Sequence, residues 1–238
     1  MEPTAEAPPG QDGRVVGLVW LVYFVTAILG AYLVKGLVVP ADAAATARNI
    51  MAHETLYRSG FAVGLIANAV YIALTALLYR LFEPVNRSIS LLAAFLSLVG
   101  CATQIIGGLF QLAPLVVLGG SRFLGAFDAE QLQAVALLSL KLYSQVFNIS
   151  LVLFGLFELT IGYLIIRSTF LPRILGVSMV IAGVAWLTFL WPPLATPLLP
   201  YIVALNVGEF LLMLWLLVKG VDVSRWREIA SARRTGTL

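Results

Sequence analysis

Six long apolar stretches are the feature that most restricts how this 238-residue chain can fold. Each is close to the roughly 20 residues that a helix needs to cross a bilayer, and only 11% of the chain is charged. Soluble domains are about 25% charged, and a soluble fold of this length could not cover so much apolar surface. The sequence therefore predicts an all-α membrane protein. The six stretches lie close to residues 15–35, 60–81, 89–118, 146–167, 174–191 and 199–219.

The distribution of Lys and Arg predicts the side of the membrane on which each loop lies. With the N-terminus inside, ten of these cations fall on the inner side and five on the outer side. An excess of Lys and Arg marks the cytoplasmic side, so we expect a multi-pass protein of the cell membrane with both termini cytoplasmic. The inner ten are Arg14, Arg80, Arg87, Arg167, Arg173, Lys219, Arg225, Arg227, Arg233 and Arg234.

Two terminal segments flank the predicted transmembrane domain of residues 14–221. Residues 1–13 hold acids and prolines but no base, which indicates a disordered cytoplasmic tail and not a cleaved leader. Residues 222–238 are basic and mildly amphipathic, so they predict a cytoplasmic tail that attracts anionic lipid; an ordinary positive-inside anchor explains the same charges. Because most of the positive excess lies there, the bilayer and its anionic lipid are the predicted partners, and nucleic acid is not.

Two loops predict helices of their own on the outer side. Asp42 can cap a helix through AAATARNIMAHETLYR, and Asp128 with Gln131 resembles a capping box. A helix over 129–167 would be about 58 Å long, more than the roughly 40–45 Å of a whole bilayer, so it must protrude, lie in the interface or bend. The predicted fold class is an all-α, six-transmembrane-helix bundle with two external (periplasmic-side) helical extensions.

The third stretch, about 30 residues long, can either tilt in the membrane or be broken near Pro114, and prolines also predict an interruption before the sixth span. Pro114 lies inside the third, where a proline removes a backbone hydrogen bond and kinks or breaks a helix. The four prolines of WPPLATPLLP, residues 191–200, predict a rigid external turn. Such breaks have functional interest because transporters bind ligands at unwound segments of their spans.

A stripe of small and polar residues runs along the approach to the second span and into it. Its members lie three or four residues apart, which places them on one helix face. Such a face suits another helix or a cavity better than lipid. We expect it to form the wall and mouth of a polar interior, with its glycines bringing a neighbouring helix close. The stripe consists of His53, Tyr57, Gly60, Gly64, Asn68, Tyr71 and Thr75.

Two carboxylates inside spans are the strongest candidates for function, because charged groups there are costly. Glu158 lies nine residues before Arg167, about 13 Å at helical rise. Glu209 lies ten residues before Lys219, about 15 Å by the same measure. At matching depths the two acids could share a proton, bind a cation or stay neutral. Hydrogen bonding that only holds helices together explains them equally well.

Amides and one external cluster complete the candidate set. An amide between helices is commonly a structural hydrogen bond, and Glu54 with Arg58 has the spacing of a surface ion pair. Each therefore has a structural as well as a functional interpretation. Besides Glu158 and Glu209, the candidates for binding a ligand or ion are Asn68, Gln104, Asn148, Asn206, His53 and Arg58.

Several chemistries are excluded by residue type. The chain has one cysteine, Cys101, and one histidine, so no disulfide within the chain, paired-histidine haem site or Cys/His metal cluster can form. No GxSxG elbow and no Walker or Rossmann glycine loop occurs. No cofactor, metal or catalytic residue is predicted, and an intramembrane enzyme is the weakest hypothesis.

Five stretches resemble the uncharacterised prokaryotic membrane proteins grouped as domain of unknown function 4386. They are VVPADAAATARNIMAHETLYRSGF, LLYRLFEPVNRSISLLAA, LGAFDAEQLQAVALLSLKLY, GYLIIRSTFLPRILGV and VGEFLLMLWLLVKGV, within residues 14–221. HE-x-L-x-R-x-G-F and F-L-P-R-I-L-G are specific in combination. The resemblance implies an integral protein of a bacterial-type cell membrane and supplies no activity or site residues.

Two functions from different classes account for these features. The first is binding, transport or sensing of a small molecule or ion through a polar cavity around Glu158 and Glu209. The second is a structural or assembly role, in which the polar residues only stabilise helix packing.

Overall fold

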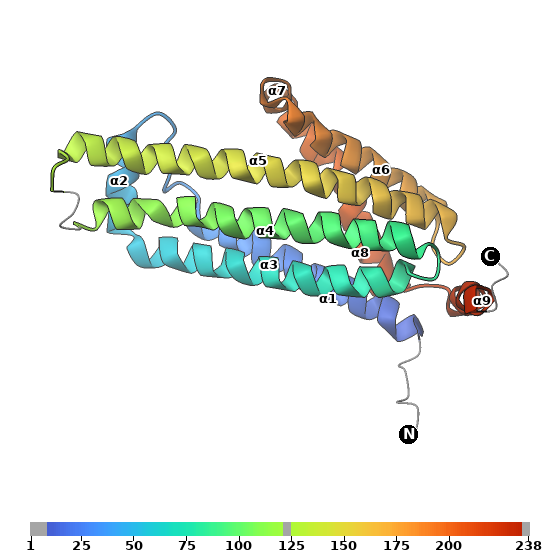
Figure 1. Cartoon of the computed structure of the whole chain (residues 1–238). Coiled ribbons are helices and arrows are strands. Elements are labelled where there is room, and N and C mark those ends of the chain that lie inside the picture. The colour runs from blue at the N-terminus through green and yellow to red at the C-terminus, as the bar shows by residue number, and fades with distance from the viewer. Residues whose placement is uncertain (1–8, 121–124, 235–238) are drawn as a thin grey trace. The chain divides into compact units, whose positions relative to one another are not determined.

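Helices form all the regular structure in the part of the chain that the computed structural model describes, residues 9–120 and 125–234. The predicted all-α class is therefore confirmed. Long helices and several shorter ones follow one another along the chain (Figure 1). In chain order they are α1 (Pro9–Val34), α2 (Ala43–Ala52), α3 (Glu54–Phe82), α4 (Arg87–Leu118), α5 (Ala129–Arg167), α6 (Arg173–Leu187), the 3₁₀ turn η2 (Thr188–Leu190), α7 (Pro192–Leu205), α8 (Val207–Val218) and α9 (Val223–Arg234).

Six helical segments among the described residues are long and apolar enough to cross a membrane, which confirms the predicted number of spans. Each overlaps one of the apolar stretches. Because α7 and α8 are both short, they make up one span together. The segments are Gly13–Val34, Glu54–Phe82, Arg87–Leu118, Ala129–Arg167, Arg173–Leu190 and Pro192–Val218.

Both helices expected in the outer loops form, with the expected caps. The Asp42 carboxylate accepts a hydrogen bond from the Ala45 amide at 2.7 Å and begins α2. At the start of α5, Asp128 accepts from the Gln131 amide at 2.8 Å, and the Gln131 side chain accepts from the Asp128 amide at 3.1 Å. The 39 residues of α5 continue without interruption. The helix is thus about 58 Å long and extends beyond a bilayer by protruding or lying in the interface.

The interruptions expected at prolines are wrong. Pro114 lies inside an unbroken α4, and residues 191–200 do not form a rigid turn, because most of them belong to α7. The first two prolines of α7 occupy its opening turn, where a missing backbone N–H costs nothing. Pro197 and Pro200 lie farther in, as spans tolerate when neighbouring groups satisfy the freed carbonyls.

Two other boundaries also differ from expectation. α1 already begins at Pro9, so the last part of the tail expected over residues 1–13 is helical; a proline is well suited to a first helical position. Residues 1–8 lie outside the described part of the chain. The first outer helix ends at Ala52 and does not run on through Arg58. His53, with φ −125° and ψ 39°, separates α2 from α3 and therefore lies off the stripe on α3.

Contacts divide the chain into two compact units, and α1, α3, α4 and α5 each contribute to both. Unit 1 comprises Met1–Leu21, Val70–Gly100 and Leu151–Leu238, and unit 2 comprises Val22–Ala69 and Cys101–Ser150. The core of unit 2 joins α2 to its neighbours through Leu37, Ile50, Tyr57, Leu115 and Leu140.

Of the two stripe glycines, Gly60 brings helices together in unit 2 as expected, since a Cβ there would lie 3.2 Å from the Gly30 oxygen of α1, whereas a Cβ on Gly64 would have no atom within 4 Å. A Cβ added to Gly30 of α1 would lie 3.2 Å from the Gly64 nitrogen and 3.3 Å from the Gly60 oxygen of α3. Only small residues allow backbones this close. Three residues before Gly60 on the same stripe, the Tyr57 hydroxyl donates a hydrogen bond to the Gln111 carbonyl of α4. In unit 2 the stripe therefore serves helix packing.

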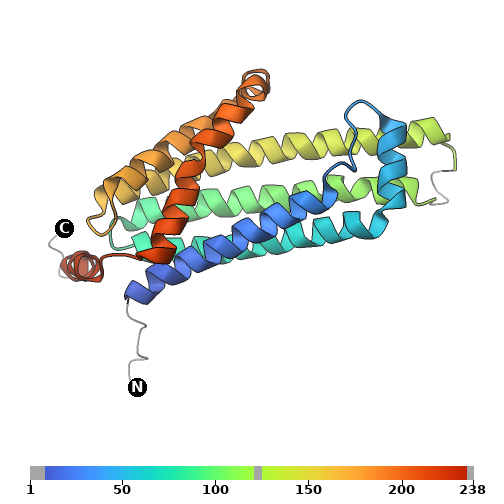
Figure 2. The same cartoon turned by 180° about the vertical axis from the view of Figure 1, so that it is seen from behind.

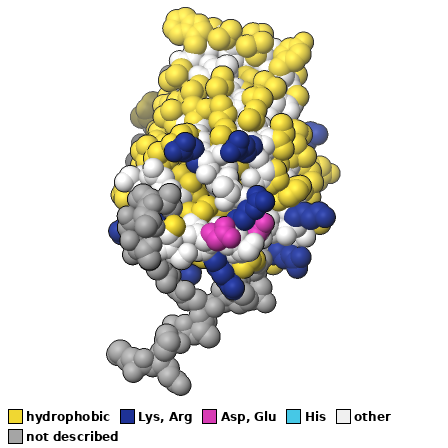
Figure 3. All heavy atoms as spheres, turned by 90° about the vertical axis from the view of Figure 1, so that its right-hand side faces the viewer, with side chains coloured by type: hydrophobic (Ala, Val, Ile, Leu, Met, Phe, Trp, Pro, Cys, Tyr) yellow, Lys and Arg dark blue, Asp and Glu magenta, His cyan; other side chains and the backbone are white. Residues whose placement is uncertain are grey.

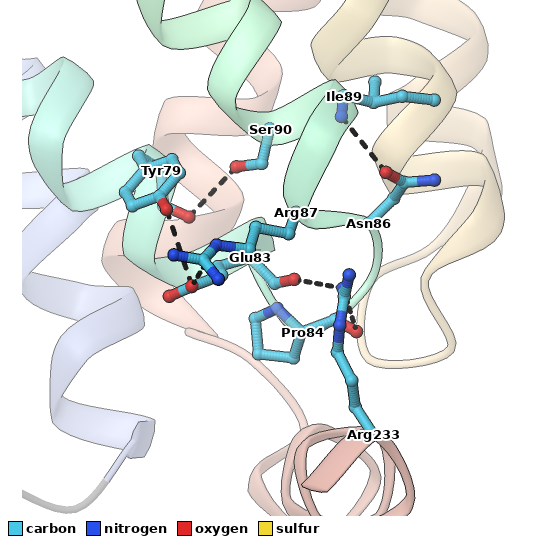
Figure 4. Close-up of polar contacts among 8 residues, drawn as sticks. All are labelled: Tyr79, Glu83, Pro84, Asn86, Arg87, Ile89, Ser90 and Arg233. Atoms are coloured by element: carbon cyan, nitrogen blue, oxygen red, sulfur yellow. Dashed lines mark hydrogen bonds and ion pairs between the residues drawn. The ribbon is translucent and has the colours of Figure 1, made fainter. Parts of the chain in front are cut away.

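The C-terminal helix α9 connects two loops of unit 1. Arg233 donates hydrogen bonds to the carbonyls of Glu83 and Pro84 in the α3–α4 loop (Figure 4). Arg225 donates to the Thr169 carbonyl in the α5–α6 loop at 3.0 Å. A single helix thus connects the ends of four helices, in a segment whose charges predicted attraction of anionic lipid or a positive-inside anchor.

This end of unit 1 is basic. Figure 3 shows Lys and Arg side chains gathered around a small acidic patch. Within α9's first turn, a hydrogen bond from the Ser224 hydroxyl, joined by one from the Arg225 amide, holds the pKa of the Asp222 carboxyl below its ordinary value. Asp222 also pairs with the Arg225 guanidinium at 3.4 Å, so it neutralises part of the local positive charge.

Removing the Arg233 side chain should loosen α9. In Arg233→Ala the two hydrogen bonds to the α3–α4 loop are lost, at about 0.5–1.5 kcal/mol for each bond. Amide hydrogen exchange within α9 should accelerate several-fold. Arg227→Ala is the matched control, because Arg227 is exposed and makes no hydrogen bond to either loop among the described residues. Equal exchange rates in the two variants would contradict the assigned role of Arg233.

Candidate functional site

Close glycine contacts surround Glu158 in unit 1. A Cβ added to Gly162 of α5 would lie 2.7 Å from the Gly176 carbonyl oxygen of α6, and one added to Gly155 would lie 2.8 Å from that of Gly183. Backbone therefore meets backbone on both sides of Glu158, as its flanking glycines predict. The carboxyl group is enclosed by protein as a result, and Glu158 is only 2% exposed.

The second carboxylate, Glu209, belongs to α8, which packs against α6 on a different face from α5. α6 and α8 lie side by side in both views (Figures 1 and 2), and a Cβ on Gly208 would lie 2.7 Å from the Ser178 carbonyl oxygen. The next residue is Glu209, which is half-buried. The carboxyl groups of Glu158 and Glu209 lie close enough to interact electrostatically. The two acids that the sequence places at matching depth thus lie within range of each other's charge.

Each carboxylate accepts a hydrogen bond from a tryptophan. Trp186 of α6 donates from Nε1 to Glu158 Oε1 at 3.1 Å. Trp20 of α1, which is fully buried, donates from Nε1 to Glu209 Oε1 at 3.0 Å. An indole offers one donor and no acceptor, so these residues hold the acids in place without neutralising them.

Two buried oxygen atoms in this region remain without a hydrogen-bond partner in the described part of the chain. They are Glu158 Oε2 and Asn206 Oδ1. The Asn206 amide nitrogen donates to the Ile202 carbonyl at 2.9 Å, which leaves its oxygen free. Buried polar atoms are rarely left unsatisfied in proteins, and each one needs an explanation such as a bound ion or water.

The charge of the acids is also uncompensated by side chains. The three ion pairs among the described residues involve neither Glu158 nor Glu209. An isolated ionised carboxylate is very costly in an apolar environment. Neutrality must therefore come from bound protons or from a cation, and free carboxylate and amide oxygens are the ligands that small hard cations prefer.

A break in the last span adds to this arrangement. α7 ends at Leu205 and α8 begins at Val207, so Asn206 alone interrupts the helix. Its backbone, at φ −73° and ψ 0°, still accepts a hydrogen bond from the Glu209 amide at 3.2 Å. The interruption expected at Pro114 or at residues 191–200 thus occurs one turn before the second acid.

Three of the predicted amides lie in unit 2. Gln104 donates to the Ser150 hydroxyl at 3.1 Å and so links α4 to α5. Asn68 donates to the Gly64 carbonyl of its own helix at 3.1 Å. Asn148 is half-buried. The contacts of Gln104 and Asn68 are those of structural amides.

The external candidates His53 and Arg58 also belong to unit 2. His53 is exposed, and its Nδ1 lies 3.1 Å from the Asn49 carbonyl oxygen. Arg58 pairs with Glu54 at 2.7 Å, the helix-surface ion pair that their spacing predicts. No group of three or more His, Cys, Asp or Glu side chains that could hold a metal occurs among the described residues.

Trp20 and Trp186 were not among the residues predicted from the sequence. A signal was present, because tryptophan prefers the membrane interface and its N–H needs a partner when buried. Trp20, seven residues into the first span and fully buried, therefore predicts a buried acceptor nearby, whereas Trp186 lies near the end of its span and carries no such signal. Which acceptor each one meets depends on the tertiary packing, since Trp20 and Glu209 are 189 residues apart in the chain.

The comparisons with known proteins agree with the resemblance noted from the motifs. The family described as Domain of unknown function (DUF4386) matches residues 15–220. No curated protein and no solved structure matches the chain. The match extends over both acids and over all but the first two residues of the six segments that can span a membrane, and the chain therefore belongs to the DUF4386 family.

Proposed function

We propose that this protein binds a cation, a proton or a small metal ion, at Glu158 and Glu209, and that this binding serves transport or sensing across the cell membrane. The observation that carries the proposal is the buried Oε2 of Glu158, which has no hydrogen-bond partner and lies within electrostatic range of a second carboxylate. Neither acid is paired with a cationic side chain among residues 9–120 and 125–234. A bound cation would satisfy the free oxygen and neutralise the charge together.

Three residues would bind the cation, each in a different way. The Glu158 carboxylate, which is enclosed by protein and positioned by Trp186, would be one ligand of the cation. Glu209 is half-buried, so the cation would enter the site from the side of Glu209. Asn206 contributes a free amide oxygen at the helix break, as discontinuous spans do in transporters.

The same proposal includes an orientation. The excess of Lys and Arg at the α9 end of unit 1 supports a cytoplasmic location for both termini, with α2 and the start of α5 on the outer side. Glu158 and Glu209 would then lie about 13–15 Å from the cytoplasmic ends of their helices, from the helical rise.

The test uses the tryptophans as reporters. The full chain in phosphatidylcholine vesicles should show a change in tryptophan fluorescence as pH or sodium concentration is varied, because Trp20 and Trp186 donate directly to the two acids. Glu158→Gln and Glu209→Gln should each remove most of this change. A flux measurement in the same vesicles separates transport from sensing.

Glu130→Gln is the matched control, because Glu130 lies on the same helix as Glu158 but is exposed. The tryptophan fluorescence of this variant should respond to pH and sodium concentration as that of the natural chain does. If Glu158→Gln also titrates like the natural chain, the acids bind no exchangeable cation. The structural alternative, in which the Trp–Glu hydrogen bonds only hold the helices together, would then be favoured.

A further inference from the structure

A shallow groove of about 360 Å³ runs between α6 and α8 on unit 1. Its walls are almost entirely apolar, and Lys219 closes one end. α6 supplies Ile174 and Ser178, and α8 supplies Trp215 and Val218. The groove contains neither Glu158 nor Glu209, so it is distinct from the proposed cation site.

The location of the groove points to lipid as its occupant. Both walls belong to segments that can span a membrane. Ile174 and Val218 are 70% and 62% exposed, a degree of exposure that an apolar side chain favours when it faces hydrocarbon. An extended acyl chain matches an open apolar channel along two helices, whereas a soluble ligand would have no access to it.

Two cationic side chains at one end of the groove favour a lipid with an anionic headgroup. Lys219, the residue after α8, lines the end of the groove, and Arg173 directly precedes Ile174 at the same end. Both cations are exposed, and neither takes part in an ion pair within residues 9–120 or 125–234. A long cationic side chain at a span terminus extends to the level of lipid phosphates.

The arginines of α9 are less available for this role. Arg225 is occupied by Asp222 and the Thr169 carbonyl, and Arg233 by two carbonyls of the α3–α4 loop. The anionic lipid expected at residues 222–238 therefore finds a better-formed site just before that segment.

We propose that the α6–α8 groove binds one phospholipid with an anionic headgroup, its acyl chain along the groove and its phosphate at Lys219 and Arg173. This inference depends on the membrane-spanning helices and not on the cation site, so either proposal can fail alone.

Trp215 in the groove wall provides the measurement. The full chain is placed in phosphatidylcholine vesicles that contain phosphatidylglycerol with brominated acyl chains, which quench nearby tryptophan. The Trp215 signal is obtained by difference from Trp215→Phe. Brominated phosphatidylglycerol should quench Trp215 more strongly than brominated phosphatidylcholine at the same mole fraction. Lys219→Gln should lower that preference about fivefold, the effect of one basic residue near the surface.

Lys141→Gln on α5 is the matched control and should keep the full preference, because Lys141 is exposed and outside the groove. Equal quenching by the two lipids in the natural chain would overturn the proposal. So would a preference that survives Lys219→Gln but disappears in Arg227→Gln, since the lipid would then lie on α9.

Discussion

Gly162→Ala should destabilise the protein by about 1–3 kcal/mol, the cost of overpacking a well-packed interior. The added Cβ would lie 2.7 Å from the Gly176 oxygen and 3.0 Å from the Val180 nitrogen. Both are backbone atoms of α6, so no side-chain rotation relieves the clash, and α5 and α6 must separate. The loss is measured from the unfolding midpoint in a denaturing-detergent titration.

Gly64→Ala is the control for this prediction. It makes the same substitution inside another long helix, but a Cβ there would have no atom within 4 Å. Alanine is also the better helix former, so Gly64→Ala should be neutral or slightly stabilising. If both variants unfold at the same detergent concentration, the backbone contact between α5 and α6 does not hold the site.

The Trp186–Glu158 hydrogen bond should show strong energetic coupling. Trp186→Phe keeps an aromatic ring but leaves the carboxyl of Glu158 with no hydrogen bond from the described residues. Leaving a buried polar group unsatisfied costs about 1–3 kcal/mol. In the Glu158→Leu background the same Trp186→Phe change should cost far less, so a double-mutant cycle should give a coupling energy of about 1–2 kcal/mol.

Trp191→Phe separates this effect from a general loss of indole. Trp191 is 67% exposed, and its removal should change stability little in either background. A coupling energy near zero between positions 186 and 158 would show that the indole does not hold the carboxyl group.

The helical architecture could be predicted from the sequence because its causes are local. Hydropathy over about 20 residues decides which segments span, and the caps at Asp42 and Asp128 need only residues three positions apart. The close helix contacts at Gly155 and Gly162 also have a local cause, since small residues in a span let the backbone of another helix approach.

The positions at which helices are interrupted could not be predicted, because they depend on which helices pack against one another. Nothing next to Asn206 in the sequence marks it as the residue that interrupts the last span, and the prolines suggested a break in the wrong place. His53 separates two helices although its amide bonds to Asn49 and its carbonyl accepts from Tyr57. The helical hydrogen-bond pattern thus continues across the bend at His53, so capping and propensity rules that use neighbouring residues do not predict the bend.

The contact between Trp20 and Glu209 also sets an order for biosynthesis. α7 has 14 residues and α8 has 12, about 21 and 18 Å, so neither crosses the roughly 30 Å hydrocarbon core alone. The last span can enter the membrane only once both have been translated. Its carboxylate then meets an indole made 189 residues earlier. A chain that ends before Glu209 therefore has no carboxylate at this position to accept the hydrogen bond from the Trp20 indole.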